Sequence, residues 1–218
     1  MTFCLKTTIV KPESNNPINN AVILLHGYGG DGSDISMLTL GWKRFLPNTI
    51  FLSPNGHEKC IINPSGFQWF DLTKDDPQYI LEQSKIAEIK LIKFINEVKN
   101  EYNLKNSQIC LSGFSQGCMM SINLGLTNDE NFNCIVGFSG KIINQEDLIK
   151  RKIASTKMLL IHGEQDGVVS PTFLLEIKDF LIRNKVEVET KMIKNCDHNI
   201  PVEASSYALN YIKNNLKV

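Results

Sequence analysis

The fold is decided by residues 109–117, which read Ile109-Cys110-Leu111-Ser112-Gly113-Phe114-Ser115-Gln116-Gly117. The stretch begins with a short, mostly apolar run typical of a buried strand, and a helical pattern follows from Gln116 to Leu126. Between them lies a G-x-S-x-G pentapeptide. In this context the central serine lies on a sharp turn, with its hydroxyl projecting above the sheet at the start of the helix. The stretch predicts that Ser115 is a catalytic nucleophile, whereas a lone motif would equally suit a glycine-rich turn with an ordinary serine cap.

The rest of the chain alternates strand-like and helix-like segments. Such alternation predicts crossover connections and a mostly parallel central sheet with helices on both faces, an α/β fold. In such a sheet, active residues gather at the carboxyl ends of the strands. The segment 57–77 lacks periodicity and is expected to be a long surface loop. We expect strands at 21–25, 49–52, 109–112, 134–138, 157–161 and 186–193, and helices at 33–45, 77–102, 116–126, 172–184 and 201–216.

The composition narrows the classes of function. The chain has 218 residues, and its 42% of apolar and 21% of charged residues are ordinary for a soluble globular protein. Lys plus Arg and Asp plus Glu each number 23, and a net charge of zero argues against a nucleic-acid partner. No apolar run is long enough to span a membrane and no signal-peptide pattern is visible, so we expect a cytoplasmic protein without stable membrane insertion.

The cysteines point to neither a metal site nor a redox motif. The six cysteines are widely spaced and none forms a C-x-x-C pair. Several lie in apolar, strand-like runs, where a free cysteine behaves as a small buried hydrophobe. We therefore expect reduced thiols and no bound metal. The sequence leaves a homodimer open, because no surface pattern demands one.

A serine nucleophile needs a base that removes its proton. In α/β folds that carry a serine nucleophile on a strand-to-helix turn, the acid and then the histidine follow the serine in the chain. Only His162 and His198 lie after Ser115. His162 ends a buried strand and favours a structural role, whereas His198 lies in the loop between the last strand and the last helix. We expect His198 to be the general base.

The acid that orients the histidine should follow the strand at 157–161. The loop after this strand offers Glu164 and Asp166, and Asp197 is a third candidate beside His198. Asp166 is preferred because it lies deeper in the loop and next to Gly167, where a tight turn can aim it sideways. Adjacent residues such as Asp197 and His198 rarely point at each other. The acid would hold the imidazole tautomer and stabilise the imidazolium.

A tetrahedral intermediate requires hydrogen-bond donors for its oxyanion. The usual donors are the backbone amide after the nucleophile and an amide from an early strand–helix loop. Here these are the amides of Gln116 and Tyr28, the latter within residues 26–30, His-Gly-Tyr-Gly-Gly. The alternative for this loop is a phosphate-binding glycine loop, but it lacks the Lys-Ser/Thr ending and the G-x-G-x-x-G spacing.

Several segments together resemble the phospholipase/carboxylesterase family of α/β-hydrolases, which includes the acyl-protein thioesterases. They span nearly the whole chain in the family's order: Leu24-Leu25-His26-Gly27-Tyr28-Gly29, Ser53-Pro54-Asn55, Trp69-Phe70-Asp71, Leu111-Ser112-Gly113-Phe114-Ser115-Gln116-Gly117, His162-Gly163-Glu164-Gln165-Asp166-Gly167-Val168-Val169 and His198. The length and the lack of a linker or repeat predict that residues 1–218 form a single domain. The resemblance implies that this domain is an α/β-hydrolase, a serine carboxylesterase or thioesterase without a cofactor. It also implies the triad Ser115, Asp166 and His198.

The resemblance extends to the substrate. It suggests that Trp69 and Phe70 line the acyl pocket, although two adjacent aromatic residues in a loop equally suit a packing anchor.

The sequence departs from the family at two places. Cys118 stands where many relatives carry another glycine. The loop 29–37 looks more like that of bacterial small carboxylesterases than that of enzymes acting on lipidated proteins, which supports a small-molecule ester or lysophospholipid at least as well as a lipidated protein. The alternatives are an acyl-protein thioesterase and a non-catalytic binding protein on the same fold.

Overall fold

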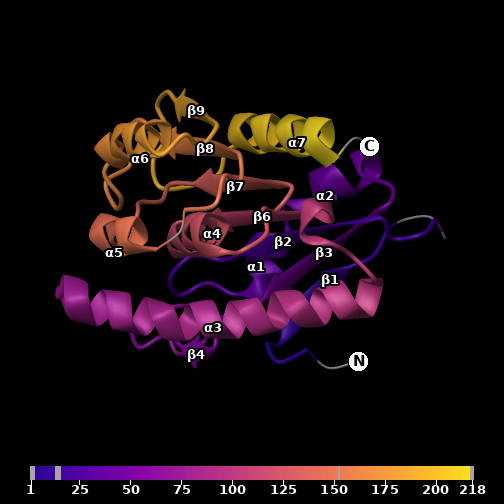
Figure 1. Cartoon of the computed structure of the whole chain (residues 1–218), viewed down its shortest axis with the longest axis horizontal. Helices are drawn as coiled ribbons and strands as arrows, with labels where there is room; N and C mark the ends of the chain where they lie inside the picture. The colour runs from indigo at the N-terminus through magenta and orange to yellow at the C-terminus, as the bar shows by residue number, and fades with distance from the viewer. Residues whose placement is uncertain (1–2, 13–15, 152, 217–218) are drawn as a thin grey trace.

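The computed structural model describes residues 3–12, 16–151 and 153–216, and its centre is a seven-stranded sheet in the order β1-β3-β2-β6-β7-β8-β9 (Figure 1). β1 pairs antiparallel with β3, and all other neighbouring strands pair parallel, which confirms the predicted mostly parallel sheet. The strands are β1 (Thr7–Val10), β2 (Asn20–Leu25), β3 (Thr49–Pro54), β6 (Ile109–Phe114), β7 (Cys134–Phe138), β8 (Met158–Gly163) and β9 (Val188–Ile193).

Helices cover both faces of the sheet. Along β2 the side chains alternate between two apolar clusters, with Ile23 and Leu25 in one and Val22 and Leu24 in the other. The first cluster also takes side chains from α3, α4, α5 and α6, and the second from α1, α2 and α7. The helices are α1 (Gly32–Ser36), α2 (Thr39–Trp42), α3 (Pro77–Tyr102), α4 (Gln116–Thr127), α5 (Gln145–Lys150), α6 (Thr172–Arg183) and α7 (Val202–Leu216), with short 3-10 helices at Lys43–Phe45 and Asn106–Gln108.

The longest helix, α3, runs along one margin of the molecule in Figure 1 and has the predicted bounds. Its first turn is capped by Asp76, whose carboxylate accepts hydrogen bonds from the amides of Gln78 and Tyr79. It ends at Asn103, which adopts the left-handed conformation with φ 52°. Its apolar face, from Ala87 to Val98, is buried in the first apolar cluster.

The predicted helix at 33–45 was wrong as a single element. The chain forms α1, α2 and a 3-10 turn, and α1 is capped by Asp31, before the predicted start. The Ser36 hydroxyl donates to the Ser33 carbonyl, and such side-chain hydrogen bonds compete with continued helix. Ile35 and Trp42 are nevertheless both buried against the sheet, so two packing anchors hold this segment.

Four further elements were missed because they are short. β1 is a four-residue edge strand, and α5 has six residues. Within the expected loop at 57–77, β4 (Glu58–Lys59) and β5 (Phe67–Gln68) form a small antiparallel pair. Their stability comes from contacts to distant parts of the chain, which a local sequence window does not contain.

Cys118 on α4 fills space left by two glycines. A Cβ atom at Gly137 on β7 would lie 2.4 Å from the Cys118 Sγ, and a Cβ atom at Gly140 would lie equally close to it, at 2.4 Å. The thiol itself is buried in the first apolar cluster. The departure from glycine at position 118 is therefore accommodated by the missing side chains on the facing strand and loop.

We expect Gly137→Ala to lower the free energy of unfolding by about 1–3 kcal/mol, because the added methyl group overlaps the Cys118 sulfur and also lies 2.9 Å from the Leu160 Cδ2. Chemical denaturation would measure the change. In a Cys118→Ala background the nearest atom of residue 118 is its Cβ, 3.8 Å from the new methyl group, so the same substitution should cost clearly less. An equal cost in both backgrounds would show that the sulfur is not the source of the clash.

Candidate active site

The candidate site lies at the carboxyl edge of the sheet. Because β2, β6, β8 and β9 run parallel, the segments that follow them leave the sheet from the same edge. These four segments carry Tyr28, Ser115, Asp166 and His198, respectively. Residues that are far apart in the sequence are thus brought to one side of the molecule.

Ser115 occupies the sharp turn between β6 and α4. Its backbone has φ 53° and ψ −116°, a conformation that residues other than glycine rarely adopt and that costs about 1–3 kcal/mol. Two hydrogen bonds hold it there: its amide donates to the Phe138 carbonyl at 2.8 Å, and its carbonyl accepts from the Met119 amide at 3.1 Å. The strained turn that the motif predicted is therefore present.

The glycines on both sides of this turn are required by backbone crowding. A Cβ atom at Gly113 would lie 2.2 Å from the Gly117 carbonyl oxygen. A Cβ atom at Gly117 would lie 2.1 Å from the Leu25 carbonyl oxygen. Neither obstacle is a flexible side chain, so neither position tolerates a larger residue without movement of the backbone.

Asp166 and His198 are joined by a hydrogen bond. The His198 Nδ1 donates to the Asp166 Oδ2 at 2.7 Å, and the other carboxylate oxygen accepts from the amides of Val168 and Val169, both at 2.9 Å. Burial alone would raise the pKa of Asp166, but these hydrogen bonds offset it and hold the pKa below its ordinary value. Asp166 is therefore ionised at neutral pH, which fixes the proton on Nδ1 and leaves Nε2 free to act as a base.

The other acid of this loop, Glu164, and the other histidine, His162, have different contacts. The Glu164 carboxylate accepts from the Asn195 amide. His162 lies with its Nε2 2.8 Å from the Val169 carbonyl oxygen and 3.3 Å from the Asp166 Oδ2, and burial lowers its pKa. Neutral His162 thus donates within the loop that carries Asp166, which fits the structural role expected for it.

The His198 ring lies beside the turn that carries Ser115. The Phe114 ring, next to Ser115 in the chain, has its centroid 4.7 Å from that of His198. A Cβ atom placed on Gly27 would lie 3.1 Å from the Phe114 ring and 3.4 Å from the Ser115 Cβ. The loop after β2, the Ser115 turn and the His198 loop are therefore packed together.

The amides of Tyr28 and Gln116 are available as donors. The neighbouring amides are used within the protein: Gly29 donates to Phe67 O at 2.9 Å, and Gly30 donates to Gly27 O at 3.1 Å. Among the described residues, no acceptor is found for the amides of Tyr28 or Gln116. The Gln116 amide is also in the first turn of α4, where helix amides lack intrahelical partners.

The structure places Trp69 and Phe70 in the core. This is the packing role that the sequence offered as the alternative to lining an acyl pocket. Their exposed fractions are 0% and 1%, and neither is among the residues that line the large groove beside His198. The Gln116 side chain holds this segment, since its Oε1 accepts from the Trp69 amide at 2.7 Å and its Nε2 donates to the Phe70 carbonyl at 2.6 Å.

His26 is a structural residue whose role the sequence did not reveal. Its Nδ1 donates to the Gly27 carbonyl at 2.7 Å, its Nε2 accepts from the Gly56 amide at 2.8 Å, and its ring stacks on Trp69 at 5.1 Å. Burial lowers the pKa of His26, so the ring is neutral. The only local signal was its position at the end of a buried strand.

Two further observations concern groups outside this site. All six cysteines are free thiols, and no cluster of three or more potential metal ligands is found in residues 3–12, 16–151 and 153–216. Over the same residues, each helix is either too short or too polar to cross a membrane.

Comparison with known proteins identifies the family to which this chain belongs. Residues 6–216 match the model of the phospholipase/carboxylesterase family. The chain is 29% identical over 171 residues to acyl-protein thioesterase 1 of Emericella nidulans, covering 70% of this chain and 71% of that protein. It is 24% identical over 206 residues to esterase YpfH of Escherichia coli, covering 91% and 84%.

Solved structures agree. Esterase PE8 superimposes with a TM-score of 0.91 at 30% identity, covering 96% of this chain and 98% of that one. The carboxylesterase of Bacillus cereus has a TM-score of 0.79 at 17% identity, covering 97% and 95%, and shows the shared fold. These structures confirm the predicted α/β-hydrolase fold. The chain therefore belongs to the phospholipase/carboxylesterase family of α/β-hydrolases.

Proposed function

We propose that this protein is a serine carboxylesterase that uses Ser115, His198 and Asp166 to hydrolyse carboxylic esters. The observation that carries the proposal is the hydrogen bond of 2.7 Å between His198 and Asp166 at the sheet edge where Ser115 lies on a strained turn. A binding protein on this fold would need neither the strained serine nor an ionised partner for the histidine.

The first half of the reaction acylates Ser115. His198 Nε2 takes the proton of the Ser115 hydroxyl as the oxygen attacks the carbonyl carbon, and Asp166 stabilises the imidazolium. The amides of Tyr28 and Gln116 donate to the oxyanion of the tetrahedral intermediate. The intermediate collapses when the leaving alcohol takes the proton from His198, which leaves an acyl-enzyme.

The second half returns the enzyme to its starting state. His198 removes a proton from a water molecule, whose oxygen attacks the acyl carbon. The second intermediate releases the carboxylic acid, and Ser115 recovers its proton from His198.

The same steps cleave thioesters and lysophospholipid esters. The names of the fungal relatives support an acyl-protein thioester as the second candidate substrate. A cytoplasmic location and a homodimer stay predictions.

We expect Ser115→Ala to lower turnover of p-nitrophenyl acetate by several orders of magnitude, because no nucleophile remains to form the acyl-enzyme. Steady-state kinetics of the purified protein would measure the loss. Ser107→Ala is the matched control, since this exposed serine precedes β6 at its opposite end. A fluorophosphonate probe should label the wild-type chain and not Ser115→Ala. An unlabelled wild-type chain would instead indicate the binding-protein alternative.

We expect Asp166→Asn to lower kcat by about 10⁴-fold, because an amide no longer stabilises the tautomer that leaves Nε2 free. Asp197→Asn and Glu164→Gln remove the two other candidate acids and should change kcat little. The pH profile of kcat would be compared in all three variants. A large loss of kcat in Asp197→Asn, with kcat kept in Asp166→Asn, would contradict the assignment and show that Asp197 is the acid.

A further inference from the structure

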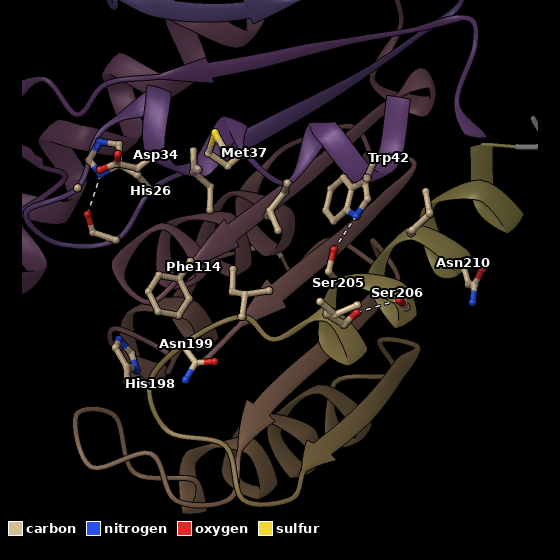
Figure 2. Close-up of a pocket in the computed structure, with 18 of the residues that line it drawn as sticks. His26, Asp34, Met37, Trp42, Phe114, His198, Asn199, Ser205, Ser206 and Asn210 are labelled. Carbon is tan, nitrogen blue, oxygen red and sulfur yellow. Dashed lines mark hydrogen bonds between the residues drawn. The ribbon is translucent and has the colours of Figure 1, made fainter. Parts of the chain in front are cut away.

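A groove of about 980 Å³ opens beside the candidate active site (Figure 2). In Figure 2 it runs from Phe114 and His198 at one end, between the α1–α2 segment above and α7 below, toward Asn210. No catalytic role proposed above requires a groove of this length.

One wall of the groove is a single face of α7. Val202, Ser205, Ser206 and Leu209 follow the spacing of residues on one side of a helix, and all four line the groove. A different face of α7, with Ala204, Ala208 and Ile212, packs against the sheet. From Val202 to Asn210 the wall extends for about 12 Å, at the rise of 1.5 Å per helical residue.

The opposite wall is the segment that the sequence had predicted as one helix. Met37, Leu38, Gly41 and Phe45 line this side, and Trp42 lies between the two walls. The Trp42 Nε1 donates to the Ser205 Oγ at 2.9 Å, a bond drawn in Figure 2 that ties α2 to α7. The groove is thus held open between two anchored walls.

The groove is mostly apolar yet open to solvent. Met37 and Phe45 on one wall are 63% and 38% exposed, and Val202 on the other is 83% exposed. Exposed apolar side chains gathered around a hollow mark a binding site on a soluble protein. The charged lining residues Asp34 and Arg44 have opposite signs, so the groove does not select a charged chain.

The inner end of the groove identifies which part of a substrate enters it. His198 and Phe114 line this end, together with Tyr28 of the proposed oxyanion site. In acylation His198 gives its proton to the leaving oxygen or sulfur, which must lie next to its Nε2. A chain attached to that atom continues from His198 into the groove. Once the leaving group has departed, the open groove admits the water that His198 activates.

We propose that this groove binds the alcohol or thiol side of the substrate, as an unbranched and mostly apolar chain. The inference rests on the proposed esterase function. It assigns selectivity for the leaving group to α2 and α7, and it makes esters of long primary alcohols better substrates than esters of short ones. Each methylene that the groove buries should raise kcat/KM by up to about fourfold.

Gly41 offers a way to fill the groove without disturbing the fold. A Cβ atom there meets no atom within 4 Å, and its φ lies outside the left-handed region that favours glycine. Gly41→Phe therefore adds a large side chain in open space on the α2 wall. Ile89→Phe is the matched control, because Ile89 is 67% exposed on α3 and does not line the groove.

The experiment compares two series of esters with wild-type chain and both variants. One series keeps an acetyl group and varies the alcohol from ethyl to octyl, and the other keeps methanol and varies the acyl chain over the same lengths. We expect wild-type chain and Ile89→Phe to prefer octyl over ethyl acetate by tenfold or more, and Gly41→Phe to lose most of that preference. Thermal unfolding and fluorophosphonate labelling would establish that each variant is folded with a reactive serine.

Each other result has a distinct meaning. A Gly41→Phe effect confined to the acyl series would place the acyl chain in the groove and overturn the assignment to the leaving group. Alcohol preferences that are the same in all three proteins would overturn the groove as a substrate site. Wild-type chain that neither hydrolyses any ester nor reacts with the probe would overturn the proposed function itself, and the groove assignment would fall with it.

Discussion

The site depends on the contact between the first turn of α4 and the end of β2. Gly117 brings the helix backbone so close to the Leu25 carbonyl that a Cβ atom would lie 2.1 Å from its oxygen. This approach starts the helix immediately after β6, and Ser115 must take the strained conformation with φ 53° to connect them. Its hydrogen bonds to Phe138 and Met119 maintain the strain, so the surrounding packing stabilises a turn that the local backbone disfavours.

The turn that carries Ser115 also holds the neighbouring loops, through hydrogen bonds of uncharged side chains. The Gln116 side chain binds the backbone at Trp69 and Phe70, and the Trp69 indole donates to the His26 carbonyl at 2.9 Å. His26 in turn accepts from the Gly56 amide. Because burial keeps His26 neutral, these contacts do not change charge near neutral pH. The ionised Asp166 is held separately, by two amides of its own loop and by His198.

Helix α7 joins the site to the groove. Its buried face packs against the sheet, and its other face forms a wall of the groove that begins at His198. The loop that carries His198 leads directly into this helix. The position of the imidazole and the shape of the groove therefore depend on the same packing of α7 against β7 and β8.

The sequence by itself determined the long strands and helices and the chemical type of the candidate site, but not the short elements. Apolar runs in β2, β3, β6, β7 and β8 and the apolar face of α3 are local patterns, because each strand or helix buries residues at its own period. The G-x-S-x-G motif is equally local as a pattern, although only Gly113 is required by a neighbour in the chain, the Gly117 carbonyl, whereas Gly117 is required by the distant Leu25 carbonyl. These signals gave the parallel sheet and the strained serine within a residue or two of where they lie.

Only the tertiary structure decided how separate loops meet. It joined Asp166 rather than Glu164 to His198, and it buried Trp69 and Phe70 through a contact with Gln116 that is 46 or 47 residues away. It also divided the segment at 33–45 and formed the groove between that segment and α7. These features depend on hydrogen bonds and packing between residues far apart in the chain, and the local periodicity of a sequence does not identify such partners.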